Sequence, residues 1–255
     1  MITNNDILAG NDKNPTPLPN AHAHNDYRHQ RPLHDALGYG FCSVEADIHL
    51  VGDQLLVAHD ADEVNSDQTL EKLYLEPLMK RVQKNKGQVY SIDADFHLLI
   101  DIKTEGVRTY RALQPVLKKY REMLTRFSSG QTDRRAVTII ISGNRPRQPM
   151  ELESDRLAGF DGRMEDLDLG SGPHFIPWIS HNWSQVFQWR GQGEFPQSEK
   201  LKLKGIVAKT HAKGRRLRFW AVPDQEACWR VLRDGGVDII NTDRLSELSQ
   251  FLLNQ

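Results

Sequence analysis

Short apolar segments rich in β-branched residues alternate along this chain with longer segments of helical spacing. The segments with strand character are residues 18–24, 41–50, 97–103, 137–142, 156–161, 174–180, 217–222 and 237–243. The clearest helical spacing is found at residues 104–127, 198–213 and 224–234. Strand and helix repeated about eight times are typical of a parallel sheet with helical crossovers. We therefore predict an α/β fold, a closed (β/α)8 TIM barrel, in preference to an open doubly wound sheet.

Two stretches depart from this rhythm. The segment "EADIHLVGDQLLVAHD" reads as two strands around Gly52 and Asp53, which predicts a hairpin. Residues 148–173 are the least regular part of the chain, and we expect a long loop there with one weak strand. No repeat or linker marks a second domain, so we predict a polar tail over residues 1–18 and one domain over residues 19–255.

The composition narrows the function without naming it. Apolar residues make up 38% and charged residues 26% of the chain, and the net charge is −1, as expected for a soluble globular protein with no affinity for nucleic acid. No apolar run approaches the roughly 18 residues of a transmembrane helix, and the first twenty residues lack the pattern of a signal peptide. A polar start also fits an exported protein after signal removal, so the compartment stays open. Cys42 and Cys228 lie in apolar patterns and are expected to be buried thiols rather than a disulfide.

Charged residues occupy alternate positions near the ends of two apolar strands. Glu45 and Asp47 share one face of the first strand, and Asp101 and Lys103 share one face of the next. The carboxyl ends of barrel strands build the active site. Converging buried carboxylates need basic partners or a cation, and oxygen ligands suit Mg²⁺ or Ca²⁺. We expect a single such ion on the three acids, the alternative being solvent-facing acids paired with basic residues.

Two histidines lie at comparable strand ends. His24 follows the first strand within "NAHAHNDY", and His59 follows "LLVA" and precedes Asp60, which can orient its ring. Two histidines on opposite sides of a metal-bound group would supply a general acid and a general base. His22 has the same strand parity as His24, so position alone does not choose between them. The other histidines are expected to be turn or packing residues: His29, His34, His49, His97, His174, His181 and His211.

The motifs "AHAHNDY", "VEADI", "LLVAHD", "LLIDIKT" and "RFWAV" follow one another in a familiar order. From about residue 20 onward the chain resembles the glycerophosphodiester phosphodiesterase and phosphatidylinositol-phospholipase-C-like superfamily, in particular a branch that begins with an HNDY motif. The resemblance implies a TIM barrel that cleaves a glycerophosphodiester or a lipid-derived phosphodiester with one divalent cation. It implies as metal ligands Glu45, Asp47 and Asp101.

The same resemblance assigns further roles. Alignment on HNDY makes His24 and His59 the catalytic histidines. The spacing between His24 and Glu45 is similar to that in the sphingomyelinase D-like group. Lys103 matches a lysine that contacts the phosphate. The remaining expected substrate contacts are His22, Asn25 and Trp220.

Departures from the pattern limit what the resemblance implies. The usual His-Arg-Gly motif lacks its arginine here, so the alcohols of the substrate stay open. The short segment between His59 and Asp101 has no room for the inserted cap domain of many relatives.

Two other functions remain open. His22 and His24 could bind zinc together with His181 and Asp243, as in metal-dependent amidohydrolases, although the acidic pair on the second strand would then have no role. A barrel that binds a phosphorylated ligand without turnover is the third possibility, because fold alone does not establish activity.

Overall fold

The computed structural model describes residues 15–254, and its centre is a closed parallel barrel. Each barrel strand pairs in parallel with the next, and β1 pairs with both β2 and β12, which closes the sheet. The barrel strands are β1 (Leu18–Ala23), β2 (Phe41–Val51), β4 (Phe96–Ile102), β7 (Val137–Gly143), β9 (Ala158–Gly162), β10 (Trp178–Asn182), β11 (Arg216–Trp220) and β12 (Ile239–Thr242). The predicted TIM barrel is confirmed.

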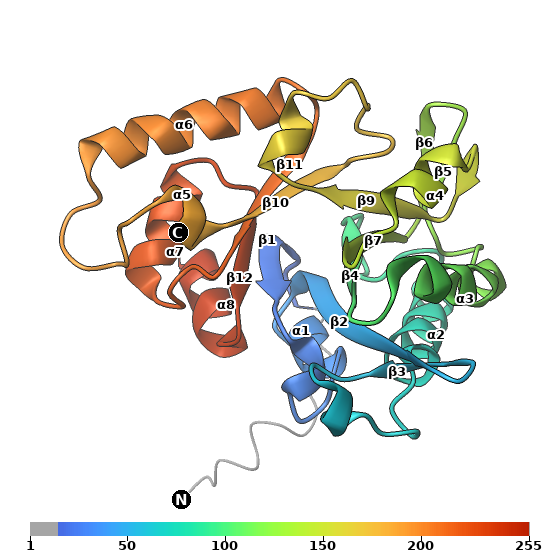
Figure 1. Cartoon of the computed structure of the whole chain (residues 1–255). Helices are drawn as coiled ribbons and strands as arrows, with labels where there is room; N and C mark the ends of the chain where they lie inside the picture. The colour runs from blue at the N-terminus through green and yellow to red at the C-terminus, as the bar shows by residue number, and fades with distance from the viewer. Residues whose placement is uncertain (1–14, 255) are drawn as a thin grey trace, which may run out of the picture.

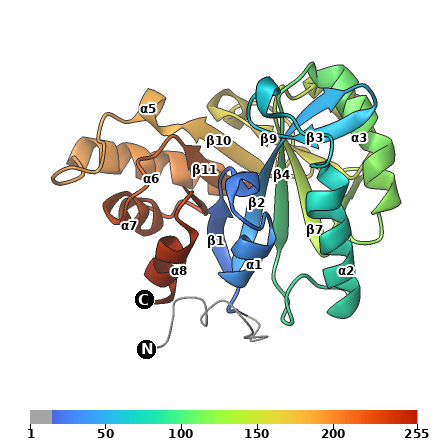
Figure 2. The ribbon, with the colours of Figure 1, turned by 90° about the horizontal axis from the view of Figure 1, so that it is seen from below.

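The helices cover the outside of the barrel (Figure 1). In Figure 2, α2 and α3 lie on one side of the strands and α6, α7 and α8 on the other. The α-helices are α1 (His34–Gly38), α2 (Glu76–Lys84), α3 (Gly106–Lys119), α4 (Arg147–Leu152), α5 (Trp183–Val186), α6 (Gln197–His211), α7 (Glu226–Asp234) and α8 (Leu245–Leu253). Helix α7 buries Cys228, Trp229 and Leu232, which share one helical face, and Cys42 is likewise a buried free thiol.

The predicted hairpin is present. Strand β3 (Gln54–Val57) runs antiparallel to the end of β2, and Gly52 in the turn adopts a φ of 60°. Between β3 and β4 the chain forms 3₁₀ and π turns, η2 (Ala61–Glu63) and η3 (Glu71–Leu75), followed by α2, so no cap domain is inserted there.

Two sequence-based boundaries need correction. The helix predicted over residues 104–127 ends at Lys119, because Leu124 and Thr125 leave it to bond with Val137 beside the barrel. The chain then enters a small antiparallel sheet. Its strands are β5 (Arg126–Ser128), β6 (Gln131–Asp133) and β8 (Asp155–Arg156).

The second correction concerns residues 148–173. They contain α4, the 3₁₀ turn η4 (Met164–Leu167) and β9, which is a full member of the barrel. The weak strand predicted at residues 156–161 is therefore present, although the two glycines of "AGFDG" have low strand propensity. Close packing requires these glycines: a Cβ on Gly159 would lie 2.7 Å from Pro177 Cγ, and one on Gly162 would lie 2.5 Å from Ile176 Cγ2.

The interior of the barrel changes from apolar to polar along the strands. An apolar layer is formed by Leu99, Ile140, Trp178 and Ile239. Two residues further along, the inward positions of β4, β7 and β10 carry Asp101, Ser142 and Ser180. Polar chemistry therefore gathers at the carboxyl end of the barrel. No helix among residues 15–254 is long and apolar enough to span a membrane.

Candidate active site

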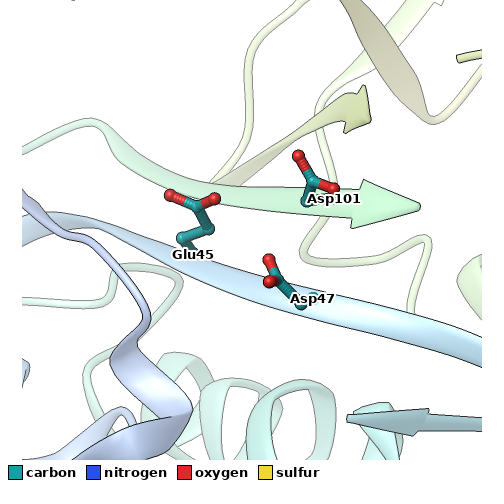
Figure 3. Close-up of side chains that lie close together, drawn as sticks. All are labelled: Glu45, Asp47 and Asp101. Carbon is teal, nitrogen blue, oxygen red and sulfur yellow. The ribbon is translucent and has the colours of Figure 1, made fainter. Parts of the chain in front are cut away.

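Three carboxylates meet at the carboxyl end of β2 and β4. Asp47 and Asp101 are direct register partners, and Glu45 lies two residues before Asp47 on the same face. One oxygen atom from each residue lies within 4.8 Å of the others. Figure 3 shows the three side chains pointing into one space. Within residues 15–254 this is the one group of acidic, histidine or cysteine side chains with a spacing that fits a metal ion.

The neighbouring side chains that donate hydrogen bonds to Asp47 contact one of its oxygens, Oδ2. The Lys103 ammonium lies 2.9 Å from Asp47 Oδ2 and 3.1 Å from Asp101 Oδ1. The Tyr27 hydroxyl donates to the same Asp47 Oδ2 at 2.7 Å. Asp47 Oδ1 is buried and has no hydrogen-bond partner among the described residues. A buried carboxylate oxygen without a partner, in a residue that lies beside two further acids, suits a cation ligand.

Glu45 is also held by one oxygen. Arg218 Nη2 donates to Glu45 Oε2 at 2.8 Å, and His22 Nε2 lies 3.2 Å from the same atom. Burial opposes ionisation, yet the Arg218 charge and the His22 hydrogen bond lower the pKa of Glu45 well below its usual range. Glu45 is therefore a carboxylate at neutral pH.

His22 supports Glu45 from inside the barrel. The ring is fully buried, and its Nδ1 lies 2.7 Å from Ser43 Oγ. Burial, and then the Arg218 charge, lower the pKa of His22 to about 4, which keeps the ring neutral. A neutral ring between Ser43 and Glu45 orients the carboxylate.

The other two acids repel one another. Burial raises the pKa of Asp47 to about 6, with Glu45 and Asp101 adding to the effect. Burial and the Glu45 charge also raise the pKa of Asp101. Burial opposes the charge of Lys103, but Asp101 and Asp47 raise its pKa, so it stays an ammonium ion. One ammonium between two carboxylates leaves negative charge that a divalent cation would neutralise.

In both predicted catalytic histidines, the Nδ1 atom lies within hydrogen-bond distance of an aspartate oxygen. His24 directly follows β1, and its Nδ1 lies 2.9 Å from Asp243 Oδ1. His59 Nδ1 lies 3.0 Å from Asp60 Oδ2, and 43% of its side chain is exposed. Burial lowers the pKa of His24, but the Asp243 hydrogen bond and the Glu45 charge outweigh it and raise that pKa overall. In each ring the second nitrogen, Nε2, is the one available to a substrate.

The remaining predicted contacts lie around the mouth. The Asn25 amide is 3.0 Å from His24 Nδ1, and its oxygen is 2.8 Å from the Tyr27 hydroxyl. Trp220 ends β11 two residues after Arg218, so both project from the same face. The Trp220 indole N–H is buried without a partner among residues 15–254, which leaves a donor for a ligand oxygen.

Sequence reasoning missed the residues that hold the acids in place. Arg218 shares strand parity with Trp220, and that parity was the signal that could have placed it in the barrel. Tyr27 stands inside the HNDY motif, where its hydroxyl had no assigned role. Asp243, which the sequence suggests only as a zinc ligand in the amidohydrolase alternative, contacts His24.

The amidohydrolase set does not assemble. Ser180, next to His181 on β10, bonds to Asp161 inside the barrel, so His181 projects from the opposite face. Its register partner Phe219 packs against Trp183 among the outer aromatic residues. His181 therefore lies apart from His22 and His24.

Comparison with known proteins identifies the family of the chain. The profile of the AIM6-like phosphodiesterase domain matches residues 12–161, which include every predicted catalytic and metal-binding residue. This chain belongs to the AIM6-like phosphodiesterase domain family.

Named relatives of this AIM6-like phosphodiesterase domain come from fungi. Altered inheritance of mitochondria protein 6 of Eremothecium gossypii is 30% identical over 92% of this chain and 69% of its own length. A homolog from Arthroderma benhamiae is 28% identical over 89% of this chain and 81% of its own length.

Solved structures show the same fold. A glycerophosphodiester phosphodiesterase from Parabacteroides distasonis superimposes with a TM-score of 0.55 and 16% identity, covering 94% of this chain and 99% of that one. The corresponding enzyme from Agrobacterium tumefaciens has a TM-score of 0.52 and 15% identity, covering 92% and 99%. At these identities the likeness extends to the TIM barrel and not to the substrate.

Proposed function

We propose that this protein is a metal-dependent phosphodiesterase that cleaves a small glycerophosphodiester- or phospholipid-type phosphodiester. The observation that carries the proposal is the group formed by Asp47, Glu45 and Asp101, in which Asp47 Oδ1 is buried and has no hydrogen-bond partner among the described residues. These three residues would hold one Mg²⁺ or Ca²⁺ ion. When bound, such an ion neutralises charge on a non-bridging phosphate oxygen.

The residues around the acids supply the rest of the chemistry. Lys103 is charged and a quarter exposed, so it can contact a second phosphate oxygen. His24 has a raised pKa and is the better general acid, which protonates the leaving alkoxide. His59 then acts as the base that takes a proton from the nucleophile, either water or a neighbouring substrate hydroxyl. Trp220 covers the substrate at the mouth.

Asp47→Asn tests the proposal directly. The amide keeps the size of the side chain but removes the charge, so Mg²⁺ and Ca²⁺ binding by calorimetry should be lost, and with it turnover of bis(4-nitrophenyl) phosphate. The matched control is Asp53→Asn in the exposed hairpin turn, which should change neither. Unchanged metal affinity in a folded Asp47→Asn protein would remove the metal site from the account.

A further inference from the structure

Helix α6 carries apolar residues on two opposite faces. The apolar residues that it buries against the rest of the molecule are Leu203, Ile206 and Val207. Successive residues of a helix are rotated by about 100°, so the face opposite to these points to solvent. That outer face of α6 consists of three exposed residues, Leu201, Gly205 and Ala208. With Leu201 62% exposed, the helix offers an apolar surface that packing does not explain.

Exposed lysines border the outer face of α6 on both sides. By the same rotation, Lys200 and Lys204 lie along one border. Lys202 and Lys209 lie along the other. Residues 197–213 contain five lysines and one acidic residue, a net charge of +4. The whole chain carries −1, so the other residues together carry −5, and positive charge is concentrated on this helix.

Neighbouring carboxylates leave most of this charge unneutralised. Of the four bordering lysines, Lys209 forms an ion pair with the exposed Asp168 at 2.7 Å, and the other three form none with residues 15–254. The one acidic residue of the segment is Glu199. Its carboxylate accepts hydrogen bonds from the backbone N–H groups of Gln188 at 2.8 Å and Trp189 at 3.2 Å. Lysine charge on α6 is therefore available to an external anion.

The chemistry of this surface fits a lipid bilayer with anionic headgroups. Lysine side chains have apolar stems and can place their ammonium groups among lipid phosphates, while an exposed leucine between them enters the acyl boundary. A nucleic acid would also attract the lysines, but its phosphate backbone offers no apolar contact for Leu201. Figure 1 shows α6 along an outer edge of the molecule, where a flat surface can reach it.

We propose that the outer face of α6 and its bordering lysines bind an anionic membrane surface. This inference goes beyond the proposed function and does not depend on the metal site. The helix would lie in the plane of the interface, with Leu201 inserted and the lysines at the level of the headgroups.

Co-sedimentation of the full chain with lipid vesicles tests the proposal. One set of vesicles is an equimolar mixture of phosphatidylglycerol and phosphatidylcholine, and the other is phosphatidylcholine alone. EDTA in the buffer prevents lipid phosphate from binding to the acidic group through a metal. We expect binding to the anionic vesicles only, and release of the protein as salt is raised from about 0.1 M to about 1 M, because exposed charges are then screened.

Two pairs of matched variants locate the contact. Lys200→Gln/Lys204→Gln should lower the partition coefficient about 30-fold, from roughly 5-fold for each lysine. Its control is Lys80→Gln/Lys84→Gln, the same change at the same spacing on exposed positions of α2, which should bind as the wild type does.

The second pair tests the apolar contact. Leu201→Gln should lower the partition coefficient about 10-fold, because it removes the inserted apolar side chain. Its control is Leu152→Gln on α4, where the leucine is 78% exposed and lies outside this surface.

Three results would overturn the proposal. The first is a wild type that stays in solution with anionic vesicles at low salt. The second is equal binding by the α6 double variant and the α2 double variant. The third is vesicle binding that Leu201→Gln leaves unchanged, since the surface would then attract polyanions in general and not lipid. Turnover and metal binding at the acidic group are measured separately, so each of these results leaves the proposed function standing.

Discussion

Among residues 15–254, the hydrogen-bond donors that contact Glu45 all lie at one of its oxygens, and the same is true of Asp47. Arg218 and His22 hold the first carboxylate, whereas Lys103 and Tyr27 hold the second. The free oxygens are thereby fixed in place before any ion arrives. Preorganised ligands of this kind bind a cation without a reorganisation cost.

The histidine roles lead to a kinetic prediction. His24→Ala and His59→Ala should each lower turnover of a phosphodiester with a poor leaving group by about 10²- to 10⁴-fold, with metal still bound. A nitrophenolate leaving group departs without a proton, so it should restore the rate of His24→Ala only. His22→Ala, which loses a buried contact to Glu45, should instead weaken metal binding.

Steady-state rates with alkyl and nitrophenyl esters, measured at saturating Mg²⁺, separate these outcomes. If the nitrophenyl ester restored the rate of His59→Ala and not that of His24→Ala, His59 would be the general acid and His24 the general base. A fully active His24→Ala with a crippled His22→Ala that still binds metal would show that the alignment on HNDY is wrong.

At the scale of elements, β9 brings Asp161 and Arg163 to the mouth, and its glycines allow β10 to approach. Gly162→Ala would place a methyl group 2.5 Å from Ile176 Cγ2 and 2.8 Å from Ile179 Cδ1. We expect a loss of about 1 to 3 kcal/mol in the free energy of unfolding, as for other overpacked cores. The control is Gly205→Ala in α6, where a Cβ meets nothing within 4 Å and helix propensity favours alanine.

Urea unfolding of both variants checks this. A Gly162→Ala protein as stable as the wild type would mean that β9 does not pack as closely as described.

The strands with continuous apolar runs could be predicted from sequence, and with them the positions of Glu45, Asp47 and Asp101. Strand parity is enough to place such residues on one face. The sequence signal for β9 is weak, because its two glycines carry no hydrophobic side chain. Arg218 could not be paired with Glu45, because 173 residues separate them and only closure of the barrel brings β11 opposite β2. The hydrophobic pattern within a strand does not show which residues meet across the closed barrel.

At the scale of the whole molecule, the acidic group that would bind the metal lowers the free energy of unfolding when no metal is bound. Asp47 has a folded-state pKa of about 6 against an ordinary value of 3.8. A raised carboxyl pKa favours folding below the ordinary value, and this contribution is lost as pH rises through the folded-state value. Without metal, Asp47→Asn should therefore be more stable than the wild type above pH 7, by up to about 3 kcal/mol, and equal to it near pH 4.

Urea unfolding in EDTA at the two pH values tests this difference, and excess Mg²⁺ should reverse it by stabilising the wild type alone. A constant difference between the two proteins across pH would show that Asp47 does not titrate in this range.

The central claim is that one divalent ion binds between β2 and β4 at the mouth of the barrel. The most direct measurement is the anomalous scattering of Mn²⁺, a stand-in for Mg²⁺, in crystals of the full chain. The account predicts a single ion bonded to oxygen atoms of Glu45, Asp47 and Asp101 at roughly 2.0 to 2.6 Å, with His22 outside the coordination shell. An ion coordinated by His22 and His24, or no ion at the three acids under saturating Mn²⁺, would contradict it.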